Sequence, residues 1–372
     1  MHSSFRFFVS VLALIIGYVQ SHGQGNSANV AGQPKQAAAG TPDAAWAEVV
    51  NLARVVSIAK SSNDAPKTKE QMDIDIAANA TRYRHAAQAA KDFYTANPSH
   101  TKAREAQKIE TLGTIRGAVL GNVAHEFAAR TISRAYRDNR THSVDDRFEV
   151  ALAMERLELS IKIRSRQAAN RPDSWKKIGD DLKVEFGDVP ALQAYFMDVA
   201  RTADNPTATK IASDVQRSAV ASAVTKARAQ AILDRNAMLG KGVALRLATI
   251  AGTTVDLAQP VGQITVIVAW SPDDPSVLAK VKRFEKSLPV GARMIYLAMG
   301  GTASQVRKAS ASATLPGTHC HAPAGPLARA ANDALKLPFG PMPRVYVLKS
   351  SGAVFGFGAV EDLPTLLRGA TG

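Results

Sequence analysis

The chain contains a single cysteine, Cys320, which lies between two histidines in the stretch LPGTHCHAPAGPL. Thiolate and imidazole groups are ligands that zinc and copper favour, so His319, Cys320 and His321 are a candidate metal site. Adjacent residues of an extended chain point to opposite sides, which disfavours three neighbours on one ion. A nearby histidine could instead activate the thiol as a nucleophile. The simplest interpretation is that Cys320 fills space in a proline-rich loop.

A second candidate lies in TVIVAWSPDDPSVLAKVKRFEKSL, residues 265–288. The apolar run predicts a buried strand that ends at Trp270, and the spacing after the second proline predicts a helix over 276–288. Asp273 and Asp274 suit a helix start, where carboxylates cap backbone N–H groups and oppose the helix dipole. An acidic pair could also touch a metal, but no further ligands are spaced for it.

The elements around these residues begin with MHSSFRFFVSVLALIIGYVQSHG, residues 1–23. A basic residue, an apolar run and a small-x-small end are typical of a secretory signal peptide. That run is too short to span a bilayer and no later segment is longer, so we expect no transmembrane segment in the mature chain. The protein is therefore expected to be exported, to the periplasm or cell envelope. Residues 24–42, rich in Gly, Ala, Pro and Gln, predict a flexible linker.

The net charge of +14 is spread over both halves of the chain and is not gathered into a basic tail. The densest basic run, residues 162–177, is interpreted as a solvated helix end and loop. No nucleic-acid-binding motif accompanies it, so no nucleic-acid partner is expected. With one cysteine, no internal disulfide can form, and stability must come from packing.

Residues 43–240 have helical periodicity throughout and predict an all-α domain. Two breaks in it are alike: FYTANPSHTKAREA and VARTADNPTATKIA both run from a helix through Asn-Pro into a second helix. These joints resemble those of tetratricopeptide-like arrays, without that family's Trp-Leu-Gly-Tyr signature. We interpret the domain as an irregular array of helical hairpins that supplies a contact surface.

The periodicity changes in residues 241–372, which predict an α/β domain with a mixed central sheet flanked by helices. A hairpin-type turn at 252–253 precedes the strand that ends at Trp270. The later elements are a strand over 292–298, helices over 304–309 and 326–335, a hairpin in MPRVYVLKSSGAVFGFGA, and a closing helix over 362–367.

This order of elements resembles the thioredoxin fold of exported thiol-disulfide reductases and redoxins. ITVIVAW is similar to that family's first core strand, and MPRVYVLKSSGAV to its strand entered by a cis proline. The resemblance implies that the bond between Met342 and Pro343 is cis and faces the redox motif. The family's two cysteines, aligned on Trp270, fall on Asp274 and Val277. Without sulfur these positions cannot exchange disulfides.

The resemblance implies a binding groove that holds extended peptide beside the cis proline. The groove residues are Trp270, Asp273, Asp274, Val277, Met342 and Pro343. We therefore expect a non-catalytic, partner- or peptide-binding scaffold protein that acts on an exported protein and needs no cofactor. The alternative is a redoxin-type thiol-disulfide oxidoreductase that acts through Cys320 alone. A third possibility is a purely structural envelope protein.

Overall fold

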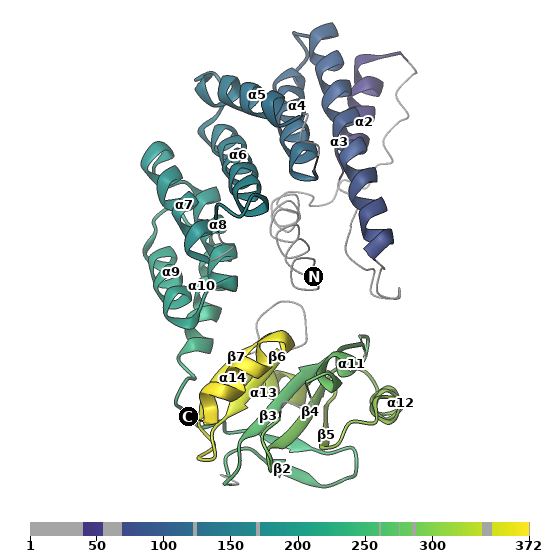
Figure 1. Cartoon of the computed structure of the whole chain (residues 1–372), viewed down its shortest axis with the longest axis vertical. Helices are drawn as coiled ribbons and strands as arrows, with labels where there is room; N and C mark the ends of the chain where they lie inside the picture. The colour runs from purple at the N-terminus through teal and green to yellow at the C-terminus, as the bar shows by residue number, and fades with distance from the viewer. Residues whose placement is uncertain are drawn as a thin grey trace. The chain divides into compact units, whose positions relative to one another are not determined.

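The computed structural model describes residues 40–54, 69–121, 125–168, 172–259, 262–274, 276–284, 288–336 and 344–371. The chain divides into two compact units, Met1–Lys226 and Ala227–Gly372. Helices make up the described part of the first unit, and a mixed sheet with helices makes up the second (Figure 1). The predicted signal peptide and nearly all of the predicted linker lie outside the described residues. The domain boundary expected at 240 remains a prediction.

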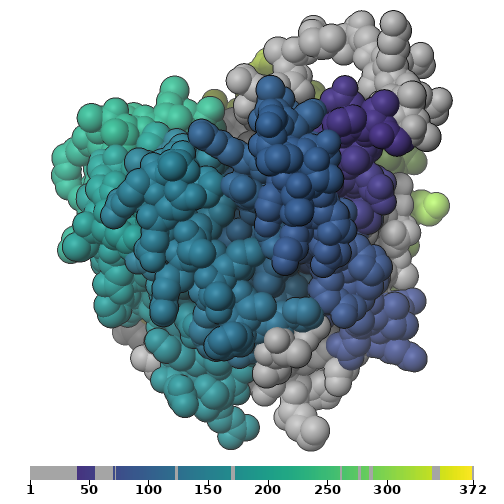
Figure 2. All heavy atoms as spheres, turned by 90° about the horizontal axis from the view of Figure 1, so that it is seen from above, coloured from purple at the N-terminus to yellow at the C-terminus, as the bar shows by residue number. Residues whose placement is uncertain are grey.

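The N-terminal unit consists of successive helices, each of which packs against the next from α2 to α9. In Figure 2, α2 lies beside α3. The helices are α2 (Pro42–Ala53), α3 (Lys69–Ala96), α4 (Ala103–Val119), α5 (Glu126–Asp138), α6 (Val144–Arg164), α7 (Pro172–Phe186), α8 (Pro190–Thr202), α9 (Asn205–Arg217) and α10 (Ala223–Asn236), the last of which runs into the second unit. This confirms the all-α class of the region, while a sequence repeat stays a prediction.

The helix starts follow from local chemistry that the sequence contains. Asp204 caps α9 by accepting a hydrogen bond of 2.8 Å from the backbone N–H of Thr207, and a proline occupies the first turn. Ser143 caps α6 in the same way through the N–H of Asp146. Such caps satisfy N–H groups that have no partner within the helix. The second Asn-Pro break of the sequence is therefore a capped helix start.

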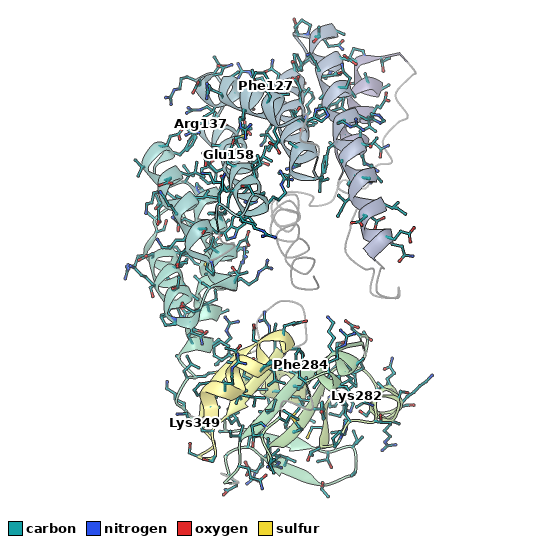
Figure 3. All side chains as sticks on the ribbon, viewed as in Figure 1. Phe127, Arg137, Glu158, Lys282, Phe284 and Lys349 are labelled. Carbon is teal, nitrogen blue, oxygen red and sulfur yellow. The ribbon has the colours of Figure 1, made fainter. Side chains whose placement is uncertain are left out.

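Ion pairs join neighbouring helices at the surface of this unit. Arg130 of α5 donates to Glu158 of α6, and Arg137 of α5 pairs with Glu185 of α7. Arg137 and Glu158 are labelled in Figure 3. Exposed pairs contribute about 0.2–1 kcal/mol each, so apolar packing between the helices stabilises the unit more than these pairs do.

The C-terminal unit contains a five-stranded sheet in the order β5-β4-β3-β6-β7 and a separate β1-β2 hairpin. β3, β4 and β5 are parallel to one another. β6 pairs antiparallel with β3, and β7 pairs antiparallel with β6. The strands are β1 (Arg246–Ala248), β2 (Thr254–Asp256), β3 (Thr265–Trp270), β4 (Arg293–Met299), β5 (Thr318–Ala322), β6 (Arg344–Leu348) and β7 (Val354–Gly358). The helices are α11 (Ser276–Lys282), α12 (Ala303–Ala313), α13 (Pro326–Leu335) and α14 (Leu363–Thr371), which follows a short 3-10 turn, η3 (Val360–Asp362).

Apolar side chains cover both faces of this sheet, and all six residues of β3 are buried. On one face, Val268 and Trp270 belong to a core with residues of α11, α12 and α14. On the other face, Ile267 belongs to a core with residues of β5 and α13. A central strand buried on both faces explains its continuous apolar sequence. The predicted α/β class with a mixed sheet is confirmed.

Two elements differ from the prediction. Thr318–Ala322 is β5, an outer strand, although its proline-rich surroundings predicted a loop. β5 forms because its backbone hydrogen-bonds to β4, although its own residues have weak strand preference. The helix expected over 276–288 ends at Lys282, where Arg283 and Phe284 form a turn.

The segment before β3 covers part of both sheet edges. On the β7 side, the N–H of Gly240 donates to the carbonyl of Val354, and the N–H of Val354 donates to the carbonyl of Lys241, each at 2.8 Å. On the β5 side, the N–H of Ile250 donates to the carbonyl of His319 at 2.9 Å. At these points a further strand cannot pair with the sheet. Among the described residues, none of the helices combines the length and the apolar composition that a membrane-spanning helix needs.

Candidate functional site

The turns that follow the parallel strands meet at one end of the sheet. Trp270 of β3 lies beside Ala298 of β4, which lies beside His321 of β5. Open α/β sheets bind ligands at this end, where the strands' carboxyl termini open into loops. We call this the strand-end site and define it as residues 270–274, residues 300–302 and His321.

The turn after β3 is closed by hydrogen bonds to the carbonyl and the hydroxyl of Ser271. The N–H of Asp274 donates to the carbonyl of Ser271 at 3.0 Å, and the N–H of Asp273 donates to the hydroxyl of Ser271 at 3.3 Å. Asp273 is exposed and Asp274 is half-buried. Both precede α11, which begins at Ser276, so their backbone N–H groups help to close a turn before the helix.

The turn after β4 packs tightly on the turn after β3. Gly301 has a φ of +66°, and a Cβ atom there would lie 2.9 Å from Cγ of Pro272. Thr302 then starts α12 with a capping box, in which its hydroxyl accepts from the N–H of Gln305 and its own N–H donates to Oε1 of Gln305 at 2.8 Å. The capping box satisfies the first N–H groups of α12 within the chain.

The two histidines of the THCHA strand have separate structural roles. Nε2 of His321 lies 3.1 Å from the carbonyl oxygen of Gly300 and links β5 to the turn after β4. His319 stacks on Tyr296 with ring centroids 4.8 Å apart, and its Nε2 lies 3.2 Å from the carbonyl oxygen of Leu315. The described residues include no group of three or more His, Cys, Asp or Glu that could hold a metal ion.

Cys320 lies in the middle of β5, opposite Leu297 of β4, and is fully buried. Burial raises the pKa of its thiol to about 11, and the positive charge of Arg293 lowers it by a smaller amount. At neutral pH the group is therefore a protonated thiol inside an apolar core. Its neighbours include Ala331 and Leu335 of α13.

The predicted groove is only partly within the described chain. Trp270 is fully buried, so it supports the strand-end site from the core and does not line its surface. The backbone of Val277 belongs to α11, but its side chain lies outside the described residues, as do Met342 and Pro343. Of the predicted set, Asp273 and Asp274 are the residues that the structure brings to the surface of this site.

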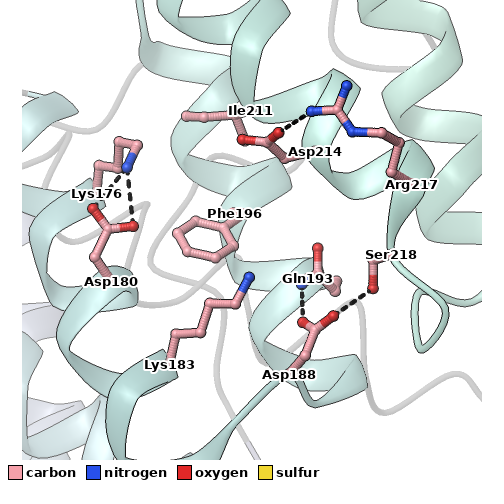
Figure 4. Close-up of a pocket in the computed structure, with 10 residues that line it drawn as sticks. All are labelled: Lys176, Asp180, Lys183, Asp188, Gln193, Phe196, Ile211, Asp214, Arg217 and Ser218. Carbon is pink, nitrogen blue, oxygen red and sulfur yellow. Dashed lines mark hydrogen bonds and ion pairs between the residues drawn. The ribbon is translucent and has the colours of Figure 1, made fainter.

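The N-terminal unit holds a separate cavity of about 440 Å³ between α7, α8 and α9. Its walls carry the ion pairs Lys176–Asp180 and Arg217–Asp214, shown in Figure 4. Asp188 accepts hydrogen bonds from Gln193 and from Ser218. The carboxylates of Asp180, Asp188 and Asp214 therefore already have partners within the chain. No local pattern of residues indicates this cavity, because it forms only where three helices meet.

These observations identify the architecture of the second unit. The C-terminal unit has a thioredoxin-like fold. Parallel strands, an antiparallel hairpin and helices on both faces agree with the predicted order of elements, to which the structure adds β5 as a third parallel strand. No family model and no curated protein matches the sequence.

Several solved structures are similar to about a third of the chain. A secreted disulfide oxidoreductase of Mycobacterium tuberculosis is 15% identical over 34% of this chain and 96% of its own, with a TM-score of 0.28. A thiol:disulfide interchange protein of Chlorobium tepidum is 16% identical over 35% and 95%, with a TM-score of 0.29. A thiol-disulfide oxidoreductase of Bacteroides fragilis is 14% identical over 30% and 85%, with a TM-score of 0.26.

Proposed function

We propose that this chain is an exported binding protein whose thioredoxin-like unit holds a partner protein or peptide at the strand-end site without disulfide exchange. The observation that carries this proposal is the burial of Cys320, the one thiol of the chain, in the middle of β5. The helix start after β3, where thioredoxin-like oxidoreductases place two cysteines, has none. The signal-peptide pattern of residues 1–23 supports export.

Thiol exchange needs an accessible thiolate, since the thiolate attacks the disulfide of the partner. The raised pKa of Cys320 opposes thiolate formation, and full burial prevents approach. Both properties count against the alternative in which Cys320 forms a mixed disulfide. A simple assay tests this point: the protein should not accelerate insulin reduction by dithiothreitol, and Cys320→Ser should not change that result. Catalysed reduction that disappears in Cys320→Ser would favour the redox alternative.

A binding role fits the construction of the strand-end site. The turns after β3 and β4 pack against each other through Gly301 and Pro272, and His321 connects the turn after β4 to β5. A surface held in one conformation loses little entropy when a partner binds. The segment before β3 covers parts of both outer strands, β5 and β7. A partner would therefore bind the turns of the strand-end site more readily than it would add a strand to the sheet.

The binding proposal is tested by placing a photo-crosslinking amino acid at Asp273 and, as a control, at Lys349. Both positions are exposed, but Lys349 follows β6 at the opposite end of the sheet (Figure 3). Activation in the native compartment should give a discrete adduct from position 273 and none from position 349. Equal crosslinking from both positions, or none from position 273, would contradict use of this site.

A further inference from the structure

Two arginines and a tyrosine gather on one face of the thioredoxin-like sheet, and Arg344 is paired with Ala269 near the end of β3. Arg344 and Tyr346 are two residues apart in β6, so their side chains leave the same face. Tyr346 lies opposite Phe357 of β7, with ring centroids 6.1 Å apart. The guanidinium of Arg235, from the end of α10, lies over Phe357 with Cζ 4.8 Å from the ring centroid.

Arg235 and Tyr346 each have a buried polar atom without a hydrogen-bond partner among the described residues. These atoms are the hydroxyl of Tyr346, whose residue is 1% exposed, and Nε of Arg235. Buried donors are nearly always paired, so an unpaired one in a native fold calls for an explanation. The flat face of the Arg235 guanidinium lies against the ring of Phe357. The Nε–H at the edge of the guanidinium can still donate a hydrogen bond.

The charges of the cluster are of one sign. Burial lowers the pKa of Arg235, and the positive charge of Arg344 lowers it further. Burial raises the pKa of Tyr346 to about 12, against the opposing effect of Arg235 and Arg344. No described carboxylate is among the groups that shift these two pKa values. The residues directly before Arg344, LPFGPMP, contain no acid either.

We propose that Arg235, Arg344 and Tyr346 bind a carboxylate group of a ligand. The hydroxyl of Tyr346 and the Nε–H of Arg235 would donate to its oxygens, and Arg344 contributes positive charge. Guanidinium groups match the planar, two-oxygen geometry of a carboxylate. A carboxylate fits this site better than a phosphate, because the surroundings are aromatic and apolar and a second negative charge is costly to bury.

Two kinds of ligand carry such a carboxylate: a small free acid, and a peptide through its C-terminus. The test titrates the full chain, dialysed into chloride buffer at constant ionic strength, with acetate, trialanine, trialanine amide and inorganic phosphate. Calorimetry should show saturable binding of acetate, of trialanine, or of both, and none of the amide. Binding of trialanine alone assigns a peptide terminus, and equal binding of acetate assigns a small acid.

Tyr346→Phe removes one hydroxyl and keeps the ring, so the fold is retained. It should raise the Kd for the bound acid by about tenfold or more, and Arg235→Gln should do the same. Arg246→Gln, an exposed arginine of the same unit, should leave the Kd unchanged. The proposal is overturned if no acid binds saturably, if Tyr346→Phe binds as tightly as the native chain, or if phosphate binds as tightly through the same residues.

Discussion

At the residue scale, Cys320 shows how burial determines what a side chain can do. The THCHA sequence suggests metal binding or a reactive thiol, and both depend on side chains that converge or reach solvent. In the strand, His319 and His321 each contact a backbone carbonyl, while the thiol lies in the apolar core. The same three residues in an extended loop would be open to metal and oxidant. Their chemistry is therefore set by the pairing of β5 with β4.

The raised pKa of Cys320 predicts a loss of stability in alkali. The thiol titrates near 9.0 when it is unperturbed and near 11 in the fold. Between these values the unfolded chain binds fewer protons at this group than the native chain, so the free energy of unfolding falls as pH rises. The total fall should be about 2–3 kcal/mol, at about 1.4 kcal/mol per pKa unit. Urea unfolding between pH 8 and pH 11 measures it.

The matched variant is Cys320→Ala, which lacks the titrating group. Its free energy of unfolding should fall less steeply over the same pH range, although it starts lower because of the cavity it creates. Parallel slopes for the two proteins would show that Cys320 does not titrate as a buried thiol.

At the element scale, the contact between two turns holds the strand-end site together, and a pair of adjacent glycines tests it. Gly300 and Gly301 both have positive φ, but a Cβ atom at Gly300 would meet nothing within 4 Å, whereas at Gly301 it would meet Pro272. Gly300→Ala should cost about 1–2 kcal/mol from backbone strain. Gly301→Ala should cost about 1–3 kcal/mol more, because it also overpacks Pro272. Equal losses in thermal unfolding would disprove the contact.

The start of α11 permits a direct test of the equivalence with oxidoreductases. The double variant Asp274→Cys, Val277→Cys should form an intramolecular disulfide under mild oxidation, because the positions are three residues apart at the start of a helix. A helix N-terminus also lowers a thiol pKa, so reactivity should appear near neutral pH. Mass spectrometry detects the bond. The single variant Asp274→Cys serves as control, and failure of the double variant to close would show that the two positions are not equivalent to the family's pair.

At the scale of the whole molecule, the end of α10 belongs to the thioredoxin-like unit. Arg235 lies over Phe357, and Gly240 hydrogen-bonds to Val354 of β7. A fragment of residues 227–372 should therefore be more stable than a fragment of residues 241–372. The difference should be about 1–3 kcal/mol, from one cation–π contact and about one hydrogen bond.

Thermal unfolding of the two fragments checks this prediction, with the longer fragment expected to melt several degrees higher. If both melt at the same temperature, the contacts of α10 do not stabilise the sheet, and the boundary at residue 240 predicted from the sequence describes the folding unit better.

The sequence by itself determined the two kinds of architecture and much of their order. Helical spacing, capping residues such as Asp204 and the buried apolar run of β3 are local signals that act within a few residues. The absence of cysteine from the helix after Trp270 is likewise visible in the sequence. These features fix the fold class and exclude an internal dithiol.

Only the tertiary structure decided where β5 runs, whether Cys320 is accessible, and which distant residues meet. β5 exists because β4 pairs with it, and its residues alone have weak strand preference. Arg235 and Tyr346 are more than a hundred positions apart in the sequence, and they come together because Arg235, near the end of α10, lies over Phe357 of β7. Burial and like-charge proximity are properties of the packed chain, and no local pattern of residues encodes them.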